Sequence, residues 1–160
     1  METYTACYKS PLGNIEIVGT HESIVELNFV EHAAFIDSEL PFCVKACHKQ
    51  IDEYFEGQRQ EFLLSLSPIG TAFQKSVWKE LEKIPYGNVA SYQDIANAIG
   101  KPNACRAVGG ANGKNPISII IPCHRIIGSD GRLTGYGGGL WRKEWLLKHE
   151  REYHTNSIIA

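Results

Sequence analysis

The chain has 160 residues, of which 43% are hydrophobic and 21% charged, and this composition is typical of a folded globular protein. No apolar run approaches the roughly 20 residues that a membrane-spanning helix needs. Residues 1–10 lack the basic start and apolar stretch of a signal peptide, so we expect a cytoplasmic protein. The formal net charge of −2 hides an asymmetry, because residues 1–67 carry a net charge of −7 and residues 68–160 a net charge of +5. This asymmetry predicts two regions with different partners, and the basic region suits phosphate groups.

The first region, residues 1–67, has the pattern of a small antiparallel sheet followed by a helix. Apolar residues alternate with polar ones along three segments, residues 3–9, 14–18 and 23–30. An amphipathic helix is predicted over residues 39–56, and Gly57 ends it. We therefore expect a compact α+β domain in which the helix packs on one face of the sheet.

The five cysteines are odd in number and lack the spacing of a disulfide framework, so we expect free thiols. Cys43 and Cys47, with His48 adjacent, raise the alternative of a metal site. No second pair of ligands accompanies them, and their spacing of four fits the predicted helix, so buried helix cysteines are the preferred interpretation. We predict no bound metal and no cofactor.

A segment rich in Ser, Pro and Gly, residues 65–71, is predicted to link the first domain to a mainly helical second domain over residues 68–150. After one capped helix, two short helices within residues 89–100 and 101–116 form a helix-turn-helix candidate. The second of these contains almost only small residues and one long side chain, Arg106. Small residues let a helix approach a surface closely. Such helix pairs also occur in proteins that never bind DNA, so this pattern alone leaves the function open.

The segment IIIPCHRIIG, residues 119–128, places Cys123 beside His124 between two runs of isoleucine. A thiol attacks as its thiolate, and a free cysteine with a pKa of about 8.5 is mostly protonated at neutral pH, so a neighbouring base is the usual means of activation. The alternative is that Cys123 is a small core residue and that His124 bonds to backbone at the end of an apolar strand over residues 119–121. On this segment alone the two interpretations are balanced.

A glycine-rich loop over residues 135–139 precedes a predicted amphipathic helix over residues 140–150. The loop lacks the Gly-Lys-Ser/Thr sequence of a phosphate-binding P-loop, which argues against nucleotide binding. We expect it to form a flexible wall that turns backbone N–H groups toward a ligand. Residues 151–160 have no clear pattern and are predicted to form a tail without regular structure.

Four segments, taken in this order and at these spacings, match a known family: NVASYQDIA, RAVGGAN, NPISIIIPCHRII and GYGGGLWRKEWLLKHE. Across residues 71–150 the chain resembles the O6-alkylguanine-DNA alkyltransferases, also called methylated-DNA-protein-cysteine methyltransferases. The acidic first region is similar in length and placement to the family's N-terminal domain. The resemblance implies DNA repair by irreversible transfer of an alkyl group from the O6 atom of a damaged guanine to a cysteine of the protein itself, here Cys123.

The resemblance also implies roles for individual residues. His124 would take the proton of Cys123 through a water molecule, and Glu150 would orient His124. Tyr92 would protonate the leaving guanine. The residues implied in binding the substrate are Asn115, Ile126, Tyr136 and Gly137. Asn115 would also tie the second short helix to the turn that carries Cys123. Those implied in binding DNA are Arg106, Ala107, Gly110, Ala111 and Arg125.

The implied partner is double-stranded DNA, bound by a monomer. The damaged base would be flipped out of the duplex, the small-residue helix would lie in the minor groove, and Arg106 would fill the vacated space in the base stack. Many family members carry Ser where this chain has Gly137, so a backbone contact from this position would survive and a side-chain contact would not. Some members bind a structural zinc through N-terminal residues that do not match here.

Other functions remain open from the residues alone. A regulator that binds one DNA sequence through the helix-turn-helix would not need Cys123. A damage sensor would signal after alkylation, but nothing in the sequence indicates an additional transcriptional domain. A hydrolase or acyltransferase with a Cys-His pair would use Cys123 but would be indifferent to DNA. Relatives that bind alkylated DNA without repairing it carry Trp in place of the cysteine, so Cys123 argues against a role in binding alone.

Overall fold

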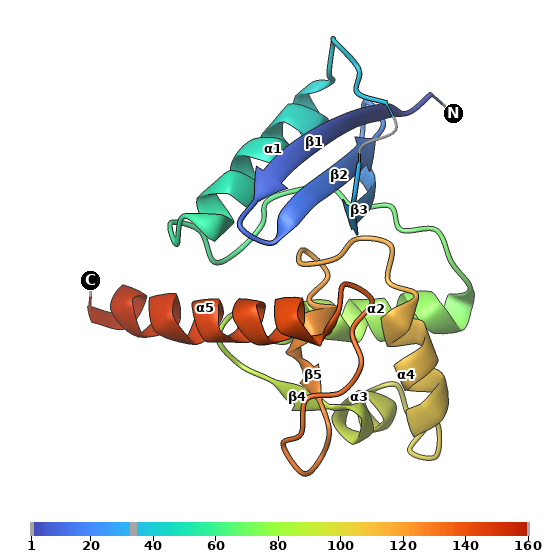
Figure 1. Cartoon of the computed structure of the whole chain (residues 1–160). Helices are drawn as coiled ribbons and strands as arrows, with labels where there is room; N and C mark the ends of the chain where they lie inside the picture. The colour runs from blue at the N-terminus through green and yellow to red at the C-terminus, as the bar shows by residue number, and fades with distance from the viewer. Residues whose placement is uncertain (1, 33–34, 160) are drawn as a thin grey trace. The chain divides into compact units, whose positions relative to one another are not determined.

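The structure, a computed structural model, describes residues 2–32 and 35–159 (Figure 1). The chain divides into two compact units, residues 1–69 and residues 70–160. A small antiparallel sheet combined with helices is the α+β class that the sequence predicts. We placed a domain boundary after residue 67, and the interpretation of the two units as separate folding domains stays a prediction.

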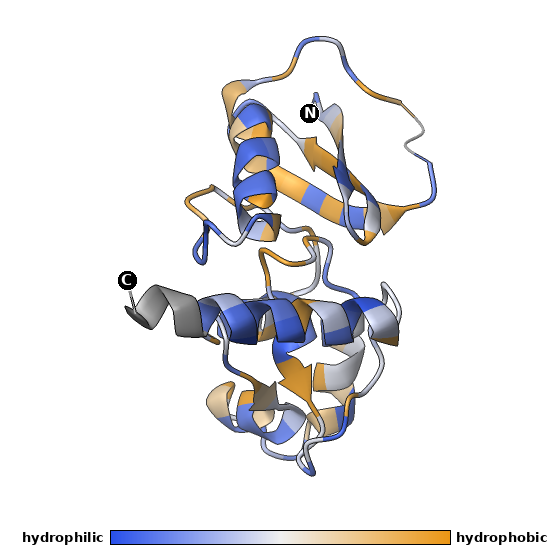
Figure 2. Ribbon diagram, turned by 60° about the vertical axis from the view of Figure 1, so that its left-hand side comes forward, coloured by the Kyte–Doolittle hydropathy of each residue, from blue (hydrophilic) through white to orange (hydrophobic). Residues whose placement is uncertain are grey.

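The first unit contains a three-stranded antiparallel sheet in the order β1-β2-β3. The strands are Tyr4–Ser10 (β1), Gly13–Gly19 (β2) and Ile24–Val30 (β3). Figure 2 shows hydrophobic and hydrophilic residues alternating along the sheet, as expected when successive side chains point to opposite faces. Ile15 and Ile17 of the central strand are fully buried. The predicted meander is therefore confirmed.

One helix, α1 (Phe42–Phe55), packs against this sheet. Cys43 donates a hydrogen bond from Sγ to the carbonyl oxygen of Thr20 at 2.7 Å. Cys47 is fully buried, and this burial raises the pKa of its thiol to about 12. Both cysteines thus have the contacts of structural helix residues. Among the described residues, no group of three or more His, Cys, Asp or Glu is arranged to hold a metal ion.

Within the described residues, four helices make up most of the second unit: α2 (Ala72–Glu82), α3 (Tyr92–Ala98), α4 (Cys105–Gly113) and α5 (Leu140–Ile159). Thr71 and Ser91 cap α2 and α3, because each side chain accepts a hydrogen bond from the backbone three residues later. Gly100, at a φ of 73°, ends α3 and allows the sharp turn to α4. Trp78 of α2 donates from Nε1 to the carbonyl oxygen of Ala111 at 2.8 Å, which fixes α4 against α2. The predicted helix-turn-helix is present.

The segment before Cys123 is not the apolar strand that we expected. Residues 118–120 form turns, and the N–H of Ile121 donates to the carbonyl oxygen of Ile117 at 3.0 Å. Ile119 has a φ of 70°, a left-handed conformation that β-branched residues rarely adopt. These positions hold isoleucine because they are buried, and not because they belong to a sheet. The elements that follow are one 3-10 turn, Cys123–Arg125 (η1), and Ile126–Ile127 (β5), which pairs in parallel with Ala90–Ser91 (β4).

Helix α5 continues past Glu150, where we predicted its end. The expected tail over residues 151–160 is helical over its described part, so that prediction is wrong. Rings four residues apart contact each other along the helix. Trp145 and His149 are stacked with centroids 4.8 Å apart, and the ring of Tyr153 is tilted against that of His149 with centroids 4.7 Å apart. No helix in the described part of the chain is long and apolar enough to cross a membrane.

Candidate active site

Cys123 lies at the start of η1, and only 5% of its surface is exposed. Its N–H donates to the carbonyl oxygen of Ile121 at 2.8 Å, so the backbone around the thiol is held in a tight turn. Burial raises the pKa of the thiol because it disfavours the thiolate, while a hydrogen bond from Asn115 and the charge of Lys143 act in the opposite direction. The thiol therefore needs a base to ionise at neutral pH.

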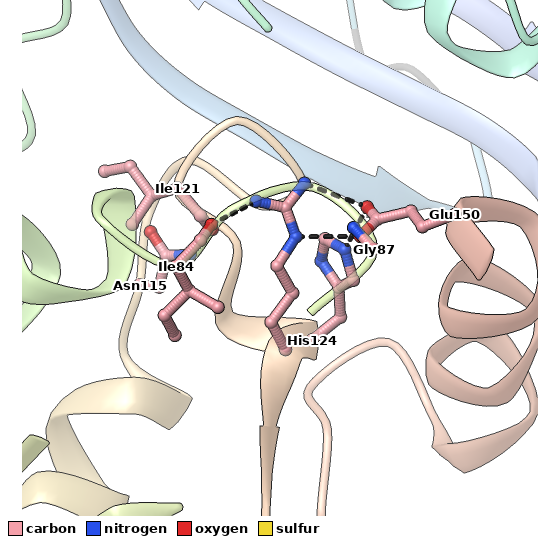
Figure 3. Close-up of polar contacts among 7 residues, drawn as sticks. Ile84, Gly87, Asn115, Ile121, His124 and Glu150 are labelled. Atoms are coloured by element: carbon pink, nitrogen blue, oxygen red, sulfur yellow. Dashed lines mark hydrogen bonds and ion pairs between the residues drawn. The ribbon is translucent and has the colours of Figure 1, made fainter. Parts of the chain in front are cut away.

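Asn115 connects the end of α4 to the turn that carries Cys123. Its Nδ2 donates to the carbonyl oxygen of Ile121 at 2.7 Å, and its Oδ1 accepts from the N–H of Ile117 at 3.0 Å. Figure 3 shows the side chain of Asn115 beside Ile121. Because both polar atoms of this buried side chain bond to backbone, Asn115 fixes the shape of the turn.

His124 and Glu150 form a fully buried pair next to Cys123. Nε2 of His124 lies 2.6 Å from Oε2 of Glu150 (Figure 3). Burial lowers the pKa of His124 by more than Glu150 raises it, so the imidazole is neutral and donates its Nε2–H to the carboxylate. The other ring nitrogen, Nδ1, is buried and has no hydrogen-bond partner among the described residues. A neutral imidazole with an available acceptor nitrogen can serve as a base.

Arg125 holds Glu150 from the other side. Its Nε donates to Oε1 of Glu150 at 2.8 Å and its Nη2 to Oε2 at 3.1 Å, while Nη1 donates to the carbonyl oxygen of Ile84 at 2.6 Å. Burial would raise the pKa of Glu150, but His124 and Arg125 outweigh it and hold that pKa well below its usual range. Arg125 is only 6% exposed and belongs to this ion pair, and the contact with DNA that we expected stays a prediction.

Thr134, in the loop between β5 and α5, contacts Tyr92 and Lys143. The hydroxyl oxygens of Tyr92 and Thr134 are 2.5 Å apart. Nζ of Lys143 donates to the carbonyl oxygen of Thr134 at 3.1 Å and lies 3.5 Å from its Oγ1. Lys143 is fully buried, and burial lowers its pKa to about 8, although Cys123 acts in the opposite direction.

The sequence analysis missed both Thr134 and Lys143. A threonine in a glycine-rich loop and a lysine on an amphipathic helix both have the pattern of exposed residues. The spacing along α5 could have revealed Lys143, since it precedes Leu146 by three residues and Glu150 by seven and so lies on the buried face of the helix. No sequence pattern indicates the contact of Thr134 with Tyr92.

Three further residues of the predicted substrate site are Tyr136, Ile126 and Gly137. Burial, followed by the charge of Cys123, raises the pKa of Tyr136 well above its usual value. Ile126 is fully buried in β5. A Cβ added at Gly137 would meet nothing within 4 Å, so this glycine borders open space.

The exposed face of α4 carries small residues and one arginine. Arg106, Ala107 and Gly110 are exposed. Ala111 is only 3% exposed, and its expected contact with DNA stays a prediction. A hollow of about 430 Å³ lies at the start of α4, and both Arg106 and Tyr92 line it. The structure therefore brings Tyr92 beside the helix that we expect to meet DNA.

Comparisons with known proteins cover both units. The sequence profile of the 6-O-methylguanine DNA methyltransferase DNA binding domain matches residues 72–152, and that of the ribonuclease-like domain of the same family matches residues 3–68. The methylated-DNA-protein-cysteine methyltransferase of Methanosarcina barkeri is 48% identical over 92% of this chain and 96% of its own length. The one from Mycolicibacterium paratuberculosis is 43% identical over 93% of each chain.

Solved structures agree with these matches. The crystal structure of the O6-methylguanine methyltransferase of Mycobacterium tuberculosis is 42% identical and has a TM-score of 0.84, covering 95% of this chain and 94% of that one. The structure of Mycobacterium tuberculosis OGT in complex with DNA is 44% identical and has a TM-score of 0.84, covering 92% of each chain. The chain therefore belongs to the 6-O-methylguanine DNA methyltransferase family.

Proposed function

We propose that Cys123 is the residue that receives the alkyl group. The chain is a methylated-DNA-protein-cysteine methyltransferase, which repairs O6-alkylguanine in DNA by moving the alkyl group directly to a cysteine of its own. The thiolate of Cys123 attacks the saturated alkyl carbon and forms a carbon–sulfur bond. The carbon–O6 bond breaks, and its electron pair stays on the guanine. The thioether product resists hydrolysis, so each protein molecule reacts once.

His124 takes the proton of Cys123 through one bridging water molecule. The neutral state of the imidazole and the unpaired Nδ1 support this role. Glu150 then stabilises the imidazolium that forms, and Arg125 keeps Glu150 ionised and fixed in place. The nucleophile Cys123 and the base His124 thus lie on η1, and the orienting acid Glu150 lies on α5.

Tyr92 donates its hydroxyl proton to the guanine as the carbon–O6 bond breaks, so that the base leaves as a neutral molecule. Its position at the edge of the hollow beside α4 supports this role. Tyr136, Ile126 and Gly137 surround the base, and Asn115 holds the turn in place. The effect of the charge of Cys123 on the pKa of Tyr136 and the open space at Gly137 support this arrangement.

Helix α4 lies in the minor groove, and the damaged nucleotide is flipped out of the duplex. The O6 atom of a stacked guanine cannot reach a cysteine that is only 5% exposed, so the base must come to the protein. Flipping costs a few kcal/mol. The exposed small residues Ala107 and Gly110 allow close approach, and Arg106 is long enough to fill the vacated stack.

The protein acts as a monomer in the cytoplasm. All five cysteines are free, which fits a reducing compartment. A regulator or sensor that only binds DNA is not favoured, because the curated relatives that match 92% or more of this chain are methyltransferases.

The observation that carries the proposal is the contact of 2.6 Å between His124 and Glu150 beside a buried cysteine. To test it, the protein is incubated with a duplex that carries O6-[methyl-³H]guanine. We expect one equivalent of label on the protein, located at Cys123 by peptide mapping. Cys123→Ala should leave the label on the DNA, whereas Cys7→Ala in the first unit should accept it normally. Equal labelling of Cys123→Ala and the wild type would contradict the proposal.

A further inference from the structure

We propose that Thr134 is a positioning residue that orients the hydroxyl proton of Tyr92 toward the leaving guanine. This inference rests on the proposed role of Tyr92 in alkyl transfer. The two oxygens are 2.5 Å apart, a short hydrogen bond in which either hydroxyl could donate. Which one donates decides whether the proton of Tyr92 is available to the substrate.

Lys143 favours donation by Thr134 in that hydrogen bond. An ammonium group has only donors, so Oγ1 of Thr134 faces Nζ, 3.5 Å away, with a lone pair. The stronger bond from Nζ to the carbonyl oxygen of Thr134, at 3.1 Å, holds the two residues together. The second lone pair of Oγ1 could still accept from Tyr92, but the hydroxyl proton of Thr134 would then lack an acceptor among its described hydrogen-bond partners. Donation by Thr134 to the oxygen of Tyr92 satisfies this proton. Lys143 has a pKa of about 8 and so carries its charge at neutral pH.

Donation by Thr134 leaves the proton of Tyr92 free. If Tyr92 were the donor, it would have to break this bond before it could protonate the guanine. In the proposed arrangement the oxygen of Tyr92 accepts, and its proton is directed into the hollow that both residues line. After Tyr92 gives up its proton, the bond from Thr134 and the charge of Lys143 stabilise the negative oxygen.

Two substitutions at Thr134 separate its hydroxyl from its shape. Thr134→Val removes the hydroxyl at nearly constant volume, and Thr134→Ser keeps it. Single-turnover transfer of the label, followed over a range of duplex concentrations, separates the maximal rate from the affinity for DNA. We expect Thr134→Val to lower the maximal rate by about tenfold or more without changing the affinity, since a general acid contributes about 10²–10⁴-fold. Thr134→Ser should restore most of the rate, and Thr3→Val, at an exposed position of the first unit, is the matched control.

The Tyr92→Phe background shows whether Thr134 acts through Tyr92. We expect Tyr92→Phe to slow the transfer, and Thr134→Val to add no further loss in this background. An equal loss in both backgrounds, or a Thr134→Ser variant as slow as Thr134→Val, would overturn the role of Thr134 and leave that of Tyr92 intact. A Tyr92→Phe variant as fast as the wild type would overturn the proposed role of Tyr92, and the inference would fall with it.

Discussion

The partners of the Glu150 carboxylate include two buried side chains and the N–H of Gly87, which donates to Oε1 at 3.4 Å. His124 bonds to one of its oxygens at 2.6 Å, and Arg125 bonds to both at 2.8 and 3.1 Å. Ionised groups are expensive to bury unless each is paired and hydrogen-bonded, and here one carboxylate pairs with the guanidinium and also orients the imidazole. Both the structure of the turn that carries Cys123 and the basicity of His124 therefore depend on Glu150.

Glu150→Gln should destabilise the protein, because it leaves Arg125 as a buried cation without a counter-charge. Removing one partner of a buried ion pair typically costs about 3–5 kcal/mol. Urea unfolding of the variant and the wild type measures the difference in the free energy of unfolding. Glu152→Gln, at an exposed position of the same helix, is the control and should unfold like the wild type. Coinciding unfolding curves for Glu150→Gln and the wild type would show that the ion pair contributes nothing.

Sequence patterns reveal charge and spacing but not which charged side chains are buried. His124 and Glu150 are 26 residues apart, and their contact depends on how α5 packs against η1, so only the family resemblance could link them. The family resemblance implied a contact of Arg125 with DNA, and nothing in the sequence indicated its buried ion pair with Glu150. Lys143 was missed because a lysine on an amphipathic helix has the pattern of an exposed residue, although its place on the buried face of α5 is visible in the spacing.

Helix α4 contains three glycines within nine residues, which is unusual for a helix. A glycine inside a helix costs roughly 0.5–1 kcal/mol relative to alanine. Packing against α2 and the bond from Trp78 to Ala111 offset this cost. Gly110 is exposed and has no side chain, so the backbone of α4 can approach another molecule closely at this position.

Ala107→Glu should weaken binding to duplex DNA, because it adds both bulk and a negative charge to the face that we place in the minor groove. We expect a loss of affinity of about tenfold or more, which corresponds to about 1.4 kcal/mol. Fluorescence anisotropy with a labelled duplex measures this loss. Ala72→Glu, at the exposed start of α2, is the control and should bind like the wild type. Unchanged affinity of Ala107→Glu would place the DNA on a different face.

The elements that the sequence predicted correctly are those with strong local patterns. The three strands alternate with a period of two, and α1 to α4 have helical periodicity, capping residues or terminal glycines. Residues 119–121 were misassigned because their conformation comes from the side chain of Asn115, which bonds to the backbone at Ile117 and Ile121. The end of α5 was placed too early because ring stacking between Trp145 and His149 is not part of a polar and apolar pattern.

The charge of the whole chain conceals how its parts differ. The formal net charge of −2 would argue against a DNA partner, but residues 68–160 carry a net charge of +5. Attraction to phosphates is local, since a Debye length of about 8 Å at physiological salt screens charges farther away. The net charge of the whole chain therefore does not decide whether its basic region attracts DNA.

A protein that reacts once has no need for a stable product, and alkylation of Cys123 should lower the stability of the whole molecule. The added group must fit beside a thiol that is 5% exposed, next to a turn that already holds Ile119 in the left-handed region. Overpacking of this kind costs about 1–3 kcal/mol. A protein of this size loses about 2–4 °C in Tm per kcal/mol, so calorimetry of the methylated and unreacted protein resolves the change. Cys123→Ala, incubated with the same duplex, controls for effects of the DNA, and an unchanged Tm after methylation would contradict the prediction.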